Sequence, residues 1–216
     1  MEKLFAPGCA LVLYKPALAK RVENFLQEQG LIDGRLGLCC LNLPPLQPGT
    51  RLIDVCPGCN RRFGREYPEI ELVSLWEILL ESDFPFPDYS GLKLALHDPC
   101  PAREKPRIHN AVRQLLRRMN IQVLEPELTK KASQCCGDSF FAKVTIPEIL
   151  LAMKDRAGQM PADEVAVYCV SCIKSMHNGG KTPRYLLDLL FAEPTEIQAY
   201  HPEEWHKLLD DYIAVH

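Results

Sequence analysis

The chain has 216 residues, 47% of them apolar and 25% charged, which excludes a disordered chain, and its formal net charge of −3 gives no electrostatic reason to expect a nucleic-acid partner. No apolar run approaches the ~20 residues that span a bilayer, and residues 1–8 are too short for a secretory signal. We therefore expect a cytoplasmic protein without a membrane span, whose thiols stay reduced.

The first part of the chain alternates strand-like runs with helical patterns. A short apolar strand is predicted at residues 3–6, and residues 16–29 carry apolar side chains at helical spacing. A β-branched run follows at residues 52–55, and an apolar stretch at residues 75–80 closes the segment. The order is therefore strand, helix, strand, with a short helix before the end of the segment.

The second part repeats this order. A strand is predicted at residues 93–96, a helix at 108–119 and a β-branched strand at 165–168, and the segment closes with an apolar stretch at 185–190. Residues 146–160 predict an additional helix that the first part lacks. The repetition indicates an internal duplication with one insertion.

Strands that alternate with helices predict an α/β fold with parallel strands and right-handed crossovers. We expect two α/β halves related by a pseudo-two-fold axis, one cysteine-rich repeat at residues 1–88 and a second at 89–196, with a C-terminal helix in 197–216. In open α/β sheets, ligands bind where the strands end, so the loops at those ends should face the junction of the halves.

All ten cysteines belong to the duplicated pattern, and each copy reads Cys…Cys-Cys…Cys-x-x-Cys. The first set is Cys9, Cys39, Cys40, Cys56 and Cys59, and the second is Cys100, Cys135, Cys136, Cys169 and Cys172. Thiolates select zinc, copper(I) or iron–sulfur clusters, and five ligands exceed the four that tetrahedral zinc needs. Iron–sulfur binding is favoured, and zinc in at least one site stays open because Cys-x-x-Cys is also a zinc half-site.

The two cysteine sets differ in spacing and in one neighbouring residue. Residues 41–55 separate the pair from the Cys-x-x-Cys motif in the first set, whereas residues 137–168 separate them in the second. The second pair is followed by Gly137, and the first by Leu41. Since glycine permits positive φ and close backbone approach, the first site is the one in which zinc or no metal stays open beside an iron–sulfur cluster.

Several segments resemble the CCG cysteine-rich domain of the heterodisulfide reductase B-subunit family, whose relatives include iron–sulfur subunits of glycolate, lactate and glycerol-3-phosphate oxidoreductases. The resemblance runs from Phe5 to about Glu196 and is strongest in the following motifs: Pro7-Gly8-Cys9, Cys56-Pro-Gly-Cys59, His97-Asp98-Pro99-Cys100, Cys135-Cys136-Gly137 and residues 179–185.

The resemblance implies one noncubane [4Fe–4S] cluster in each cysteine set, with a disulfide substrate bound between the two clusters. It also implies a ferredoxin-like iron–sulfur subunit and a flavoprotein subunit as partners. His97 is a candidate proton donor or a structural residue, and Arg103 is a candidate cation beside the second cluster. Residues 179–182 look like a phosphate loop but lack its first glycine, and they predict a turn before a helix starting at Pro183.

Three functions follow from these patterns. The first is a disulfide-reductase-type oxidoreductase subunit with two clusters. The second is an electron-transfer subunit of a hydroxy-acid oxidoreductase that has no substrate of its own. The third is a zinc-stabilised assembly or maturation factor. A protein with one [4Fe–4S] cluster and one zinc is a further alternative, in which the two cysteine sets hold different metals.

Overall fold

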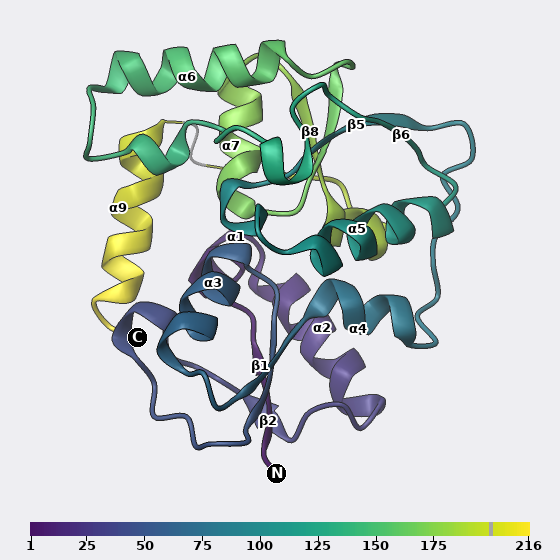
Figure 1. Cartoon of the computed structure of the whole chain (residues 1–216), viewed down its shortest axis with the longest axis vertical. Coiled ribbons are helices and arrows are strands. Elements are labelled where there is room, and N and C mark those ends of the chain that lie inside the picture. Colours follow the sequence, from purple (N-terminus) through teal and green to yellow (C-terminus); the bar gives the residue numbers. More distant parts are fainter. Residues whose placement is uncertain (199–200) are drawn as a thin grey trace.

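A computed structural model describes residues 1–198 and 201–216 and contains two parallel sheets of four strands each (Figure 1). In the first sheet the order is β2-β1-β3-β4, and in the second it is β6-β5-β7-β8. The strands are β1 (Lys3–Ala6), β2 (Gly34–Arg35), β3 (Arg51–Asp54), β4 (Glu71–Ser74), β5 (Lys93–His97), β6 (Gln122–Leu124), β7 (Glu164–Val167) and β8 (Thr182–Tyr185). The predicted α/β fold in two similar halves is confirmed.

Helices connect the strands in a similar order in both halves. They are α1 (Cys9–Tyr14), α2 (Pro16–Glu28), α3 (Pro57–Glu66), α4 (Leu75–Glu81), α5 (Pro106–Arg118), α6 (Ile146–Gly158), α7 (Val170–Asn178), α8 (Leu186–Leu190) and α9 (Pro202–Ile213). Four short 3-10 turns complete the described elements: η1 (Cys40–Asn42), η2 (Cys100–Ala102), η3 (Lys130–Ala132) and η4 (Asp138–Phe140). The additional helix predicted in the second half is confirmed as α6.

The cysteines follow strand ends because the strands are parallel. β1 and β3 are parallel and pair from Lys3 opposite Arg51 to Ala6 opposite Asp54. Their carboxyl ends therefore lie side by side at the same end of the sheet. Cys9 and Cys56 come directly after those ends, and Cys100 and Cys169 follow β5 and β7 in the same way. The fold thus gathers cysteines that are distant in sequence.

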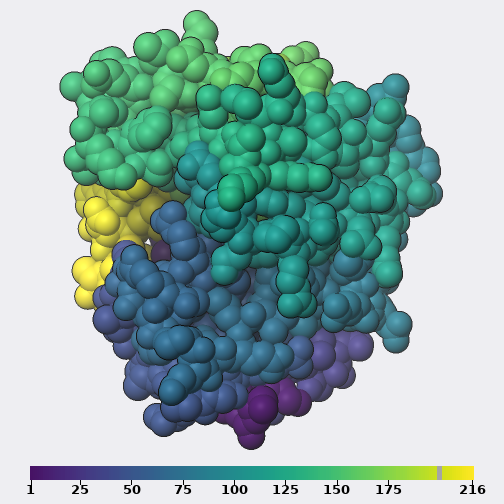
Figure 2. Space-filling model, in the orientation of Figure 1, coloured from purple at the N-terminus to yellow at the C-terminus, as the bar shows by residue number. Residues whose placement is uncertain are grey.

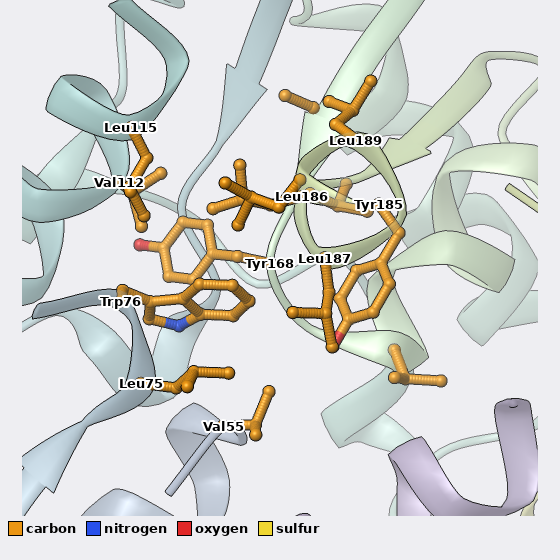
Figure 3. Packing of buried hydrophobic residues seen from close by; sticks show 14 of the residues in the cluster. Val55, Leu75, Trp76, Val112, Leu115, Tyr168, Tyr185, Leu186, Leu187 and Leu189 are labelled. Atoms are coloured by element: carbon orange, nitrogen blue, oxygen red, sulfur yellow. The ribbon is translucent and has the colours of Figure 1, made fainter. Parts of the chain in front are cut away.

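One apolar core joins the two halves. Buried residues from both sheets form a single cluster, and in Figure 3 Trp76 of α4 lies beside Tyr168, which follows β7. Their ring centroids are 6.3 Å apart in an edge-to-face arrangement, and both side chains are fully buried. Tyr14 of the first half also donates to Asp188 of the second at 2.6 Å. The halves therefore fold against each other.

The segment after Gly179 differs from the sequence prediction, which placed a helix from Pro183. Residues 182–185 form strand β8, in which Pro183 stands opposite Val165, and α8 begins only at Leu186. The strand tolerates proline because β8 is the edge of its sheet, where no further strand needs the missing N–H. The prediction of a helix start at Pro183 was wrong.

The C-terminal helix α9 lies against both halves, as the yellow atoms in Figure 2 show. Trp205 is buried and donates from Nε1 to Ser171 Oγ at 3.0 Å, while the backbone N–H of Cys39 donates to the carbonyl of His216 at 3.1 Å. The predicted helix region 197–216 includes residues 199–200, which lie outside the described residues. No helix in the described part of the chain is both long and apolar enough to cross a bilayer.

Candidate metal-binding site

The second cysteine set forms a compact group of thiols. Cys100 Sγ lies 3.6 Å from Cys135 Sγ, and Cys136 Sγ lies 3.3 Å from Cys172 Sγ. Cys136 and Cys172 are buried, and all five cysteines of the set are free thiols. Cys169 belongs to the same group, because contacts with Cys136 and then with Cys169 raise the pKa of Cys172. The structure therefore brings together all five predicted residues of this set.

The first set is assembled in the same way. Cys9 Sγ lies 4.0 Å from Cys39 Sγ. The neighbouring thiol of Cys40 lowers the pKa of Cys39 to about 3, and the neighbouring Cys39 raises the pKa of Cys40 to about 12. Contacts with Cys40 and then Cys56 raise the pKa of Cys59. These interactions link all five thiols of the first set.

Crowding prevents each set from ionising fully in the bare protein. In the second set, the Cys100 thiol lowers the pKa of Cys135, while Cys135 raises the pKa values of Cys100 and Cys136. Several thiolates this close repel one another unless a cation lies between them. Five soft donors that need a shared positive charge fit an iron–sulfur group or another thiophilic metal.

Helix starts support the thiolates of both Cys-x-x-Cys motifs. Cys56 is the N-cap of α3 and Cys169 is the N-cap of α7, so the helices expected after the motifs begin inside them. The positive end of each helix dipole favours anionic sulfur. Contact with Cys59, together with the backbone N–H groups of Gly58 and Cys59, lowers the pKa of Cys56 to about 7. Ligand ionisation is thus assisted by the local fold.

Gly137 is required by the additional helix α6. Its φ is +103°, and a Cβ there would lie 2.7 Å from Met153 Cγ and 3.2 Å from the carbonyl oxygen of Ile149, both on α6. The first half has no such helix, and Leu41 is half-exposed. The N–H of Leu41 donates to Cys39 Sγ at 3.5 Å, as the N–H of Gly137 donates to Cys135 Sγ at 3.4 Å. The missing glycine therefore reflects the missing helix.

We expect Gly137→Ala to lower the free energy of unfolding by about 2–4 kcal/mol, since it adds both left-handed strain and overpacking. Gly49→Ala is the matched control because Gly49 has φ +79° and no atom within 4 Å of a built Cβ. That control should lose only about 1–2 kcal/mol from strain. Urea unfolding of both variants checks this, and equal losses would show that α6 does not constrain Gly137.

Asp98 connects the three segments that carry the second cysteine set. Its carboxylate accepts two hydrogen bonds from Arg113, at 3.1 and 2.8 Å, and one from Tyr168 Oη at 2.7 Å. It also accepts from the backbone N–H of Lys130 at 2.8 Å, and its carbonyl accepts from Ser133 Oγ at 2.6 Å. Asp98 thus fixes the loops before Cys100, Cys135 and Cys169 relative to one another.

His97 and Arg103 both lie at the second site. A ring nitrogen of His97 lies within 4.8 Å of the sulfurs of Cys136 and Cys172, and His97 Nδ1 accepts from Arg156 Nε at 3.3 Å. Burial, aided by the charge of Arg156, lowers the pKa of His97 to about 3, so the ring is neutral. Arg103 donates to the carbonyl of Ser133 at 2.6 Å. Sequence reasoning missed Arg156, whose only signal was its place in a helical pattern.

Two cavities adjoin the cysteine sets and share one residue. The first, of about 300 Å³, is lined by all five cysteines of the first set. The second, of about 550 Å³, is lined by Cys100 and Cys135. Arg61 of α3 lines both cavities, and Ser171 from the second Cys-x-x-Cys motif lines the first. The two cysteine sites therefore adjoin across the junction of the halves.

Residues 94–177 match the family model described as the CCG cysteine-rich domain. This segment is similar to CCG cysteine-rich domains, and it spans less than half of the chain. It runs from within β5 to within α7 and contains every cysteine of the second set. The first cysteine set lies outside the matched segment, although its sheet has the same strand order. No curated protein matches the chain. The CCG domain and the clustered thiols together indicate an iron–sulfur or redox protein.

Proposed function

We propose that the chain is an iron–sulfur redox protein similar to the B-subunit family of heterodisulfide reductases, with one noncubane [4Fe–4S] cluster in each cysteine set. One observation carries the proposal: two groups of five thiols lie at the junction of two similar halves, and their cavities share Arg61. The donor sets are the two cysteine quintets. A disulfide or a related two-electron acceptor would bind between them.

The stoichiometry of the reaction suits a paired site. Splitting one disulfide takes two electrons and two protons and yields two thiols. An iron–sulfur cluster, when bound, supplies one-electron chemistry, so two clusters match one disulfide bond. A ferredoxin-like iron–sulfur subunit and a flavoprotein subunit would be the electron donors, in the cytoplasm. The helix starts at Cys56 and Cys169 stabilise anionic sulfur on either side of the substrate.

Anaerobic purification followed by iron, sulfide and zinc analysis tests the cofactor. We expect about eight irons and about eight sulfides per chain. About four irons with one zinc would support the mixed form with zinc in the first site. Colourless protein without iron would overturn the proposal.

A reduction assay with an artificial one-electron donor tests the reaction. We expect the iron-loaded protein to convert a small disulfide into two thiols, which a thiol reagent quantifies. Iron-loaded protein that accepts electrons but reduces no disulfide would instead support the electron-transfer subunit of a lactate- or glycolate-type oxidoreductase.

A further inference from the structure

The larger cavity lies beside the second cysteine set and not at its centre. Cys100 and Cys135 line it, but Cys136, Cys169 and Cys172 do not. In contrast, all five cysteines of the first set line the smaller cavity. At about 550 Å³, the larger cavity is within the usual range for small-molecule sites. It is therefore open space next to a candidate metal centre.

Positive charge dominates the lining of this cavity. Four cationic side chains line it: Arg61, Arg103, Lys143 and Arg156. Asp155 is the one carboxylate among its lining residues. Four cations and one carboxylate leave a formal excess of three positive charges. Arg61 lies on α3 of the first half. The other three belong to the second half: Arg103 directly follows η2, Lys143 follows η4, and Arg156 lies on α6. The fold therefore brings together cations from both halves.

None of these four cations forms an ion pair with a carboxylate among the described residues. Arg103 donates to the carbonyl of Ser133, and Lys143 donates to the carbonyl of Ser139 at 2.9 Å. The buried Arg156 donates to neutral acceptors, including Ser133 Oγ at 3.1 Å. Arg113 in the same half differs, because Asp98 and Glu125 neutralise it. The positive charge of the cavity is therefore available to an anionic ligand.

We propose that this cavity binds the anionic end, a carboxylate or a phosphate, of a small substrate whose sulfur atom lies beside Cys100 and Cys135. Guanidinium groups bind such oxyanions through paired, charge-assisted hydrogen bonds. Arg61 lines the cavities of both cysteine sets, so it also holds an anionic substrate that extends toward the first set. This inference rests on the proposed function and specifies its substrate class.

Binding is tested without any reduction step. Suberate carries two carboxylates at the same spacing as 3,3′-dithiodipropionate but has no disulfide, and 1,8-octanediol is its uncharged counterpart. Calorimetry on the anaerobically purified protein should show suberate binding at least about tenfold tighter than the diol, and more weakly as salt increases. Butyl phosphate in place of suberate distinguishes phosphate from carboxylate preference. Equal binding of suberate, butyl phosphate and the diol would overturn the proposal.

Variants locate the binding. Arg103→Gln should weaken suberate binding about tenfold or more, since it removes a charge-assisted contact. Lys143→Gln provides a second variant at an exposed side chain, where substitution should leave folding intact. Lys154→Gln is the matched control, because Lys154 is exposed on α6 and does not line the cavity. The proposal fails if Lys143→Gln and Lys154→Gln both bind suberate as the natural protein does.

Reduction of three disulfides of similar length separates this inference from the proposed function. We expect kcat/KM to fall from the dianionic 3,3′-dithiodipropionate to the neutral 2-hydroxyethyl disulfide and the dicationic cystamine, by about tenfold at each step. Reduction at equal rates would retain the proposed function and overturn the anionic substrate. Tight suberate binding without reduction of any disulfide would retain the anion site and overturn the reductase.

Discussion

Replacing Asp98 with asparagine should lower the free energy of unfolding by about 3–5 kcal/mol, since it breaks a buried ion pair by removing one partner. Asp98 is fully buried, and its carboxylate accepts hydrogen bonds from Arg113, Tyr168 and Lys130. An amide cannot accept all of these bonds, and among the described residues it leaves Arg113 with only the partly exposed Glu125 as its ionic partner. Urea unfolding by circular dichroism measures the loss.

The matched control is Asp88→Asn. Asp88 is exposed, lies in the loop between the two sheets and contacts Ser90 and Asn120. Its substitution should leave the unfolding midpoint nearly unchanged. If Asp98→Asn proves no more harmful than Asp88→Asn, the carboxylate does not hold the cysteine loops in place.

The contribution of Asp98 should depend on pH. Burial by itself would raise the pKa of Asp98, but the hydrogen bonds and charge of Arg113 outweigh burial and hold that pKa well below its usual range. A lowered folded-state pKa gives stability that is present above the unfolded value of about 3.9 and lost as pH falls toward the folded value. The difference between natural protein and Asp98→Asn should therefore shrink below about pH 4.

Replacing Cys136 with alanine should remove about half of the iron, from about eight to about four atoms per chain. Cys136 is buried, and its sulfur lies 3.3 Å from that of Cys172, inside the thiol group of the second set. The first set should keep its iron, because none of its thiols contacts Cys136. Anaerobic iron and sulfide analysis gives the answer.

Cys40→Ala in the first set is the reciprocal variant and should leave the iron of the second set. Circular dichroism of both variants shows whether the fold is retained. Cys169→Ser, at a half-buried position, tests the second set again if Cys136→Ala does not fold. Full iron content in a folded Cys136→Ala protein would exclude Cys136 as a ligand.

The repeated features of the fold were predictable from the sequence, because both copies of the repeat contain the same motifs in the same order. The duplicated cysteine motifs predicted two thiol groups, and the apolar spacing of residues 146–160 predicted α6. The prediction of a helix from Pro183 was wrong, since the sequence alone does not distinguish a proline in an edge strand from a proline at a helix start.

Contacts between segments that are distant in sequence were not predictable. Nothing in the motif around Gly137 reveals that α6 packs against it. The sequence shows Leu41 in place of this glycine, and the fold shows that the first half lacks the helix that requires one. Asp98 lies two residues before Cys100 in the sequence, but its partners Arg113 and Tyr168 become neighbours only through the fold. Arg61 follows a first-set motif, and only the three-dimensional structure places it beside Cys100.

The shared core has a consequence for how the molecule denatures. Trp76 of the first half packs on Tyr168, the residue before Cys169, so cutting the chain between the sheets would expose large aromatic surfaces on both pieces. Melting should therefore be all-or-none, with one calorimetric transition. When either half unfolds, the thiol group of the other half loses its packing support, so heating should disrupt both thiol groups in the same transition.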